Sequence, residues 1–390
     1  MKNETWIKNI LQELSAQHHM RHLTSYKKNG AIIDTGQQRL INFSSNNYLD
    51  LIDNEVVIKT AEDFLRTTGT GAGASRLVTG TFSCHEELEK RIARFKEYPT
   101  ALIFGSGFLT NLGVISVCVG KGDYVFADRL SHASIIDAIR FCGAHINRFN
   151  HNDPDHLQTL LDRCPSSGKK LIVTESVFSM DGDCAPLSDI TALAVQYSAM
   201  VMIDEAHATG VFGPGGRGLV CQYKLESLVN VSMGTFSKAL ASYGGFVTCS
   251  DEMRALLINK ARSFIYTTAL PPAVIGAING AFTVLESDSS MGTRLLENAS
   301  FFRSLLNDAG LNTGKSSSQI VPVIIGDSEK TLALSQRLKE QGLLAVAIRP
   351  PTVPRGTARL RLSITLGHSR EMLQHAAALI IRSAEEEGVL

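Results

Sequence analysis

The sequence predicts an α/β protein in which a large, mostly parallel sheet is followed by a smaller α+β unit. Short apolar runs alternate with helix-length stretches from about residue 60 to 285, as in strands that are buried on both faces and connected by helices. After residue 286 the helices are separated by fewer strands. A chain of 390 residues is long enough for two such units in close contact.

The first 45 residues precede the sheet and are expected to form a segment of their own, 1–45. Apolar residues at helical spacing predict an amphipathic helix over 4–20: Ile7, Ile10, Leu11 and Leu14. Two short alternating stretches, 31–33 and 40–43, predict a small hairpin.

The large unit is expected to cover 46–285 and the small C-terminal unit 286–390. Apolar runs in the large unit predict strands at 101–104, 124–127, 171–174, 200–203, 231–233 and 246–248. In the small unit the sequence predicts helices over 294–308, 329–341 and 369–386 and strands over 319–325, 344–348 and 359–365.

Charge and cysteine content exclude several classes of protein. Lys plus Arg and Asp plus Glu both number 38, so no net charge attracts nucleic acid or an anionic membrane. No window approaches about eighteen consecutive apolar residues, and the first residues lack the apolar core of a signal peptide. The seven cysteines are scattered and never spaced C-x-x-C, which favours free thiols. We therefore expect a cytoplasmic protein without a metal site.

Two stretches imitate the motifs of a nucleotide-driven motor. Residues 309–316 loosely resemble a phosphate-binding loop, and Asp-Glu-Ala-His at 204–207 spells a helicase-like box. A phosphate-binding loop must follow a buried strand and open a helix. Here a predicted helix precedes the loop and a predicted strand follows it, so we reject a motor function.

Functional side chains cluster where the predicted strands of the large unit end, which is where α/β sheets bind ligands. The strand at 101–104 runs into a glycine turn, and free N–H groups near Gly107 and Phe108 could hold a phosphate. A plain turn is the alternative. His132 follows the next strand and could lie flat on an aromatic ring, although a lone histidine is more often structural.

Asp204 ends the apolar run 200–203, where a carboxylate is costly to bury unless it meets a cation. A protonated pyridine nitrogen is such a cation, and His207 could reach a phenolic oxygen on the same ring. A Mg²⁺-binding acid is the alternative, but its phosphate-binding loop is missing.

Lys238 lies beyond the strand at 231–233, together with the hydroxyls of Thr235 and Ser237. A desolvated lysine beside an anion site suits the formation of an imine, whereas alone it would be read as a surface lysine. The ordered set of a glycine turn, a histidine, Asp-x-x-His and Thr-x-Ser-Lys is far more specific than any one member. It predicts a pyridoxal 5'-phosphate enzyme with Lys238 as the Schiff-base lysine.

These motifs resemble the α-oxoamine synthases, a branch of the aspartate-aminotransferase-like (fold type I) pyridoxal-phosphate enzymes. The resemblance extends from Tyr26 to about His368 and is carried by the stretches 46–49, 71–76, 175–183, 204–207, 234–238, 266–272 and 356–361. It implies an enzyme that joins an amino acid to an acyl-CoA and releases CoA and carbon dioxide.

The resemblance also implies roles for single residues. Lys238 would abstract the substrate's Cα proton, His132 would stack on the ring and contact the substrate, and Asp204 would pair with the ring nitrogen. The phenolic side would be contacted by Ser179 and His207, and the phosphate by Gly107, Phe108, Thr235 and Ser237. Arg361 would hold the substrate carboxylate. Thr267 and Thr268 match positions that reach the partner's cofactor, which implies a homodimer.

Within the family, the stretch 348–354 is most similar to the branch that joins L-alanine to a pimeloyl thioester in biotin biosynthesis. Arg21 and Thr352 fall at positions that contact the substrate in that branch. Other branches, which use glycine or serine with other acyl-CoA donors, share the same core motifs and remain alternatives. A plain aminotransferase and a degenerate or regulatory subunit on the same fold are the remaining ones, although an intact Lys238 argues against the latter.

Overall fold

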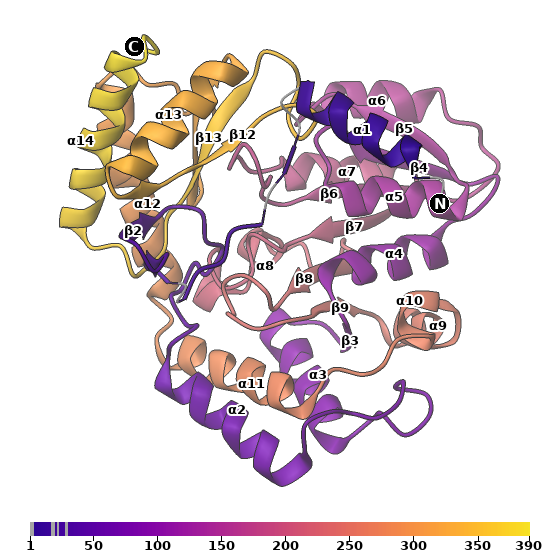
Figure 1. Cartoon of the computed structure of the whole chain (residues 1–390). Coiled ribbons are helices and arrows are strands. Elements are labelled where there is room, and N and C mark those ends of the chain that lie inside the picture. Colours follow the sequence, from indigo (N-terminus) through magenta and orange to yellow (C-terminus); the bar gives the residue numbers. More distant parts are fainter. Residues whose placement is uncertain (1–3, 17–19, 22, 28–29) are drawn as a thin grey trace.

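The centre of the molecule is a seven-stranded sheet with the strand order β3-β9-β8-β7-β6-β4-β5 (Figure 1). The computed structural model describes residues 4–16, 20–21, 23–27 and 30–390. Strands β4 to β8 all run parallel to one another, whereas β9 is antiparallel to both of its neighbours, β3 and β8. The strands are β3 (Thr100–Phe104), β4 (Tyr124–Asp128), β5 (His145–Phe149), β6 (Lys170–Glu175), β7 (Met200–Asp204), β8 (Val231–Thr235) and β9 (Gly245–Cys249). This arrangement confirms the predicted large parallel sheet.

Both faces of the sheet are buried, which explains the continuous apolar runs in its strands. In β7, Val201 and Ile203 belong to the apolar cluster on one face and Met202 to the cluster on the other. One face packs on α4 (Gly107–Cys118) and α5 (Ala133–Cys142), and the other on α3 (Ser83–Lys96), α6 (Pro154–Asp162) and α7 (Leu187–Gln196). The six strands expected in this unit are all present.

Strand β5 was not predicted from the sequence. It lies at the edge of the sheet and pairs only with β4, and four of its five residues are not buried. An edge strand needs no continuous apolar run, so the pattern that revealed its neighbours is missing here.

The C-terminal unit has a three-stranded antiparallel sheet in the order β10-β13-β12. Its elements are α12 (Met291–Asp308), β10 (Ile320–Gly326), α13 (Ser328–Glu340), β11 (Leu343–Leu344), β12 (Val346–Ile348), β13 (Ala358–Ser363) and α14 (Arg370–Glu386). The single strand expected at 344–348 is wrong: its first part, β11, pairs with the N-terminal hairpin, and only β12 joins this sheet. The motor-like stretch lies between α12 and β10, in the expected helix-to-strand order.

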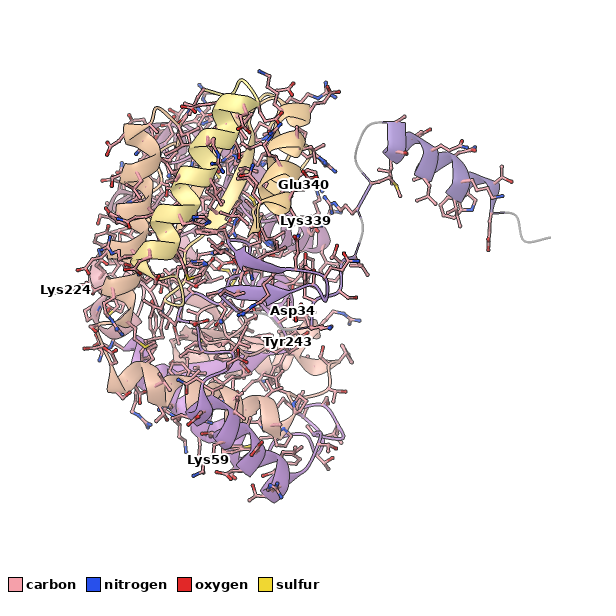
Figure 2. All side chains as sticks on the ribbon, turned by 60° about the vertical axis from the view of Figure 1, so that its left-hand side comes forward. Asp34, Lys59, Lys224, Tyr243, Lys339 and Glu340 are labelled. Carbon is pink, nitrogen blue, oxygen red and sulfur yellow. The ribbon has the colours of Figure 1, made fainter. Side chains whose placement is uncertain are left out.

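The N-terminal hairpin is present as β1 (Ile32–Asp34) and β2 (Arg39–Asn42), which are antiparallel. Because β2 also pairs with β11, the segment 1–45 shares a sheet with the C-terminal unit. The predicted N-terminal helix is α1 (Thr5–Ala16), and residues 17–19 of the expected range lie outside the described residues. None of the residues of α1 is buried, and Figure 2 shows it standing away from the rest of the chain.

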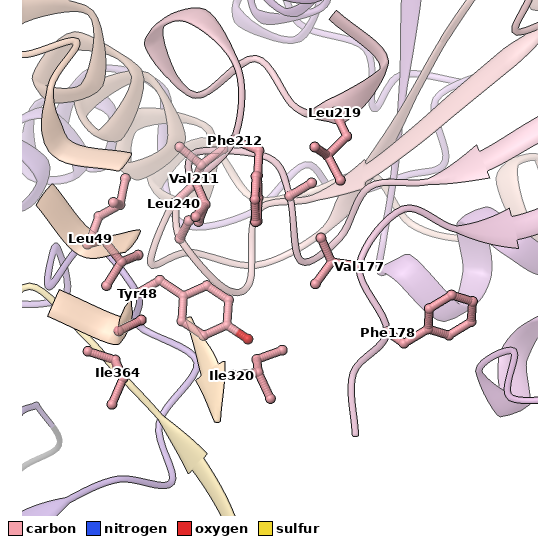
Figure 3. Close-up of a cluster of buried hydrophobic side chains, with 14 of the residues drawn as sticks. Tyr48, Leu49, Val177, Phe178, Val211, Phe212, Leu219, Leu240, Ile320 and Ile364 are labelled. Carbon is pink, nitrogen blue, oxygen red and sulfur yellow. The ribbon is translucent and has the colours of Figure 1, made fainter. Parts of the chain in front are cut away.

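The large and small units share one apolar core. Figure 3 shows Tyr48 and Leu49 beside Ile320 and Ile364 of the C-terminal unit, and all four belong to the same buried cluster. The other helices are α2 (Glu55–Thr68), α8 (Leu219–Gln222), α9 (Asp251–Lys260), α10 (Arg262–Ile265), α11 (Pro272–Ser287) and the 3₁₀ turn η1 (Pro214–Gly216). In the described part of the chain, no helix has the length and apolarity needed to cross a membrane.

Candidate active site

The carboxyl ends of β4, β6, β7 and β8 open into a cavity of about 240 Å³ beside the first turn of α4. Most of the residues predicted to bind the cofactor line this cavity. They are Gly107, Phe108, His132, Asp204, His207, Thr235, Ser237 and Lys238. Parallel strands end at one edge of the sheet, so residues far apart in the sequence meet there.

Lys238 lies in this cavity just beyond β8 and is half-buried. The loss of hydration lowers the pKa of its amine to about 8, and Arg361 acts in the same direction against the attraction of Asp204 and Glu175. An amine with this pKa is partly unprotonated near neutral pH. It can therefore act as a nucleophile or a base.

Asp204 is buried at the end of β7, and both its oxygens accept hydrogen bonds. Oδ1 accepts from the backbone N–H of Ala206 at 2.9 Å, and Oδ2 from Nδ2 of Asn111 at 2.9 Å. No Lys, Arg or His side chain forms an ion pair with it among the residues that the structure describes. A buried carboxylate held in this way is suited to a cationic ring nitrogen in the cavity.

His132 precedes α5 at the mouth of the cavity. Its backbone N–H donates to Oε1 of Glu175 at 2.7 Å, and its Nδ1 lies 2.7 Å from the hydroxyl of Ser134. Partial burial lowers the pKa of His132, and the positive charge of Lys238 lowers it further against the attraction of Asp204. The ring is therefore neutral near pH 7 and available to stack on a flat ligand.

The helix start at Gly107 fits a phosphate. Helix α4 begins there, and the hydroxyl of Ser106 already caps the N–H of Leu109, which leaves the N–H groups of the first two residues without a partner inside the helix. The hydroxyl of Thr235 lies 2.8 Å from that of Ser237 on the facing strand end. A side chain at Gly107 would begin 3.1 Å from the methyl group of Met233, so a larger residue would narrow the site.

A second cavity of about 310 Å³ shares Lys238, His132 and His207 with the first and adds Ser179 and Arg361. Arg361 is 8% exposed, and within the described residues its guanidinium donates to neutral oxygens alone, including the Ser179 carbonyl at 2.6 Å. In the described part of the chain, no carboxylate forms an ion pair with this guanidinium. Arg361 is therefore a buried cation available to an anionic ligand.

His207 connects the two cavities. Its Nδ1 lies 2.7 Å from the hydroxyl of Tyr48, and burial, followed by the charge of Lys238, lowers the pKa of His207 well below its usual value. The Tyr48 hydroxyl in turn donates to Asn46 Oδ1 at 3.0 Å, beside Arg361. The imidazole is therefore neutral and fixed in orientation.

Arg21 and Thr352 lie in a third cavity, a groove of about 820 Å³ between α1 and the stretch 346–352. This groove shares Val346 and Ile348 with the second cavity, so the two lie next to each other. Leu11 and Leu14 of α1 line the opposite side. An extended, largely apolar substrate arm fits such a groove.

Thr267 and Thr268 do not line the cavity of Lys238 in the described part of the chain. They border a separate cavity of about 20 Å³ with Arg76 and His85. Thr267 nevertheless lies close to the glycine turn, since a side chain at Gly105 would begin 3.6 Å from its methyl group.

Glu175 and Asn111 line this cavity, and neither was assigned a role from the sequence. Glu175 ends the apolar run of β6 as Asp204 ends that of β7, which is the signal that could have revealed it. Burial, followed by the negative charge of Asp204, raises the pKa of Glu175 to about 8. Asn111 lies one helical turn after Gly107, on the face of α4 that meets the cavity.

A family profile for aminotransferases of class I and II matches residues 38–380. The chain belongs to this aminotransferase family. A curated relative, the 8-amino-7-oxononanoate synthase of Geobacter sulfurreducens, is 43% identical over 383 residues, which cover 97% of this chain and 98% of the relative.

Two solved structures confirm the fold type I architecture of this aminotransferase family member. A lysine-to-alanine variant of a serine palmitoyltransferase from S. paucimobilis, solved with a bound PLP-myriocin aldimine, is 32% identical with a TM-score of 0.93 and full coverage of both chains. An 8-amino-7-oxononanoate synthase from Francisella tularensis is 28% identical with a TM-score of 0.77, covering 90% of this chain and 99% of that one. The predicted resemblance to α-oxoamine synthases, the enzymatic function and the pyridoxal-phosphate cofactor are thereby confirmed.

Proposed function

We propose that this enzyme joins L-alanine to a pimeloyl thioester, with loss of carbon dioxide and release of the thiol, to give 8-amino-7-oxononanoate for biotin biosynthesis. The observation that carries the proposal is Arg361, a buried guanidinium without a carboxylate partner in the described chain, which lines the same cavity as the Lys238 amine. An amino acid offers a carboxylate to the first group and a reactive α-carbon to the second. The name of the relative from Geobacter sulfurreducens supports this choice of substrates.

The residues of the first cavity fit pyridoxal phosphate by charge and shape. When bound, this cofactor supplies an aldehyde that captures amines and a ring that takes up the charge of a carbanion. Asp204 would keep the proton on its ring nitrogen, and His132 would stack on the ring. Ser179 and His207 would contact its phenolic side, and the phosphate would be held by Gly107, Phe108, Thr235 and Ser237.

Two side chains then act on the substrate. The planar fork of Arg361 binds the alanine carboxylate and so fixes the orientation of the α-carbon. The Lys238 amine, with its pKa lowered to about 8, removes the α-proton and returns it at the end of the reaction. His132 and His207 line both cavities, exclude water from the reacting carbon and contact the substrate.

The groove beside α1 is proposed to hold the acyl arm. Its lining combines apolar side chains such as Leu11, Leu14 and Ile348 with Arg21 and Thr352. A pimeloyl chain has the matching properties, since its methylene groups are apolar and its far end is a carboxylate. The groove does not distinguish CoA from an acyl carrier protein as the thioester carrier, so both are substrates to test.

A homodimer is proposed as the working form. Tyr243 and Tyr266, two large aromatic residues near the glycine turn and the Thr267–Thr268 pair, are 56% and 72% exposed. Coverage of this surface by a second copy would bring Thr267 and Thr268 to the partner's cofactor. The seven cysteines are all free thiols, which supports a cytoplasmic location.

The test is thiol release by the purified protein loaded with pyridoxal phosphate. L-Alanine with pimeloyl-CoA or pimeloyl-acyl carrier protein is compared with glycine and acetyl-CoA or succinyl-CoA, and with serine and palmitoyl-CoA. The last pair is included because a serine palmitoyltransferase has the TM-score of 0.93. Preference for alanine with a pimeloyl donor is expected. Preference for another pair would overturn the proposed substrates.

A further inference from the structure

The side chain of Asn111 connects two groups of the cofactor cavity that come from different strand ends. It is 1% exposed, and its Nδ2 lies 2.9 Å from Asp204 Oδ2 and 2.9 Å from the hydroxyl of Ser134. That hydroxyl lies 2.7 Å from Nδ1 of His132. One amide therefore links the acid and the imidazole that are proposed to face the ring of the cofactor.

The direction of each hydrogen bond in this chain is fixed by chemistry. An ionised Asp204 can only accept, so the nitrogen of the Asn111 amide, and not its oxygen, must face the carboxylate. The Ser134 hydroxyl accepts the second amide hydrogen and keeps its own hydrogen for Nδ1 of His132.

A second donor acts on the same imidazole nitrogen. The backbone N–H of Ser134, which can only donate, lies 3.2 Å from Nδ1 of His132. Nδ1 is therefore an acceptor, and the proton of the neutral imidazole is on Nε2. The backbone N–H of Ser134 and the relay from Asn111 through the Ser134 hydroxyl therefore favour the same tautomer.

The same amide holds Asp204 in its charged form. With Oδ1 bound to the N–H of Ala206 and Oδ2 to Asn111, hydrogen bonds favour the carboxylate and fix its plane. The titratable groups around it are Glu175 from β6, His132 before α5, and Lys238 and His207 beyond β8 and β7. None of them donates a hydrogen bond to Asp204 among the described contacts, so Asn111 is the side chain that performs this task.

We propose that Asn111 is a positioning residue of the cofactor site, which orients the Asp204 carboxylate toward the ring nitrogen and holds His132 as the Nε2–H tautomer through Ser134. The inference rests on the proposed roles of Asp204 and His132. According to this proposal, the buried amide of Asn111 sets how Asp204, which faces the ring nitrogen, lies relative to His132, which stacks on the ring.

The test is the isosteric change Asn111→Asp, with the affinity for pyridoxal phosphate measured by absorbance titration of the stripped protein between pH 6 and 9. Two adjacent carboxylates share one proton, so the pKa of the new pair is raised. Below that pKa the shared proton restores both the hydrogen bond and the charge of the wild-type site. Above it the carboxylates repel each other.

We expect the dissociation constants of the variant and the wild-type protein to differ by no more than a few-fold near pH 6. Near pH 9 their ratio should rise to about tenfold to a hundredfold, which corresponds to the free energy of one hydrogen bond to a charged group. Taking the ratio at each pH cancels the titration of Lys238, Glu175, His132 and His207, which both proteins share. A ratio that does not change with pH would show that Asn111 only fills space and would overturn the inference.

The control is Asn279→Asp, the same change at a half-buried position of α11 outside all four cavities, for which the ratio should stay near one. If Asn111→Asp does not fold, Asn111→Ala serves instead and should weaken cofactor binding about tenfold at every pH. Unchanged affinity in that variant would equally overturn the inference. Failure of the wild-type protein to bind pyridoxal phosphate would instead contradict the cofactor site itself.

Discussion

The cofactor cavity and the groove beside α1 differ in how their side chains are held. In the cavity Asp204, His132 and His207 each have side-chain or backbone hydrogen bonds on the ends of buried strands. In the groove Arg21 and Thr352 are exposed, and α1 buries none of its residues. The proposed chemistry would thus be built on the ends of buried strands, and the proposed recognition of the acyl arm would be left to surface segments that can vary without disturbing it.

The largest effect is expected at the centre of the cavity, from Lys238→Ala. Turnover should fall by about four orders of magnitude or more, because the variant lacks the amine that is proposed both to hold the cofactor and to act as the base. The melting temperature of the cofactor-free protein should not fall, because an amine whose pKa is lowered by burial is itself costly to bury. Thiol release and circular dichroism measure the two quantities. A variant that turns over normally would contradict the assignment.

Arg361→Gln tests the second cavity, which shares lining residues with both the cofactor cavity and the groove. The KM for the amino acid should rise about tenfold to a hundredfold, because a charge-assisted pair with the substrate carboxylate is lost. The KM for the acyl donor should change little. Arg359→Gln is the matched control on the same strand, since Arg359 already pairs with Asp181 at 2.6 Å. Equal effects of the two changes on the amino acid KM would argue against a specific role for Arg361.

Changes in the groove should be smaller and confined to the acyl donor. We expect Arg21→Gln and Thr352→Val each to raise the KM for the pimeloyl thioester by up to about tenfold, because exposed polar contacts contribute modestly. The affinity for pyridoxal phosphate should be unchanged, which absorbance titration can verify. A weakened cofactor site in either variant would show that the groove and the cavity are not independent.

Glu175→Gln is expected to act on the stability of the folded chain. The pKa of Glu175 is raised from 4.5 to about 8 in the folded chain, so the folded state binds more protons than the unfolded state between these values. Its contribution to the free energy of unfolding therefore falls as the pH rises from about 4.5 to 8. Glu175→Gln should reduce this fall by removing the titration.

Melting temperatures of the cofactor-free proteins at pH 5 and pH 8 give the comparison. The melting temperature of the wild-type protein should fall more than that of the variant between pH 5 and pH 8. Parallel behaviour of the two proteins would mean that Glu175 ionises normally in the fold. His151, whose bonds to Asp128 and Asp183 overcome the effect of burial and raise its pKa to about 10, contributes equally to both proteins and cancels.

Much of the site followed from local sequence patterns. Apolar runs marked six strands of the central sheet, and the polar residues after them were predicted to form one site. Asp204 and Lys238 are among those that line one cavity. This worked because parallel strands end at a common edge, so a residue's place after its strand also gives its place in the molecule. The glycine turn before α4 was recognised for the same reason.

Only the tertiary structure decided which segments pair and which side chains bond across the cavity. The edge strand β5 has no continuous apolar run, and the stretch 343–348 is divided between two sheets although its sequence is uniformly apolar. The bond from Asn111 to Asp204 joins residues 93 apart in the chain, and that from Tyr48 to His207 joins residues 159 apart. Hydrogen bonds depend on distances of a few tenths of an ångström, and such distances arise from packing of the whole chain and not from the order of residues along it.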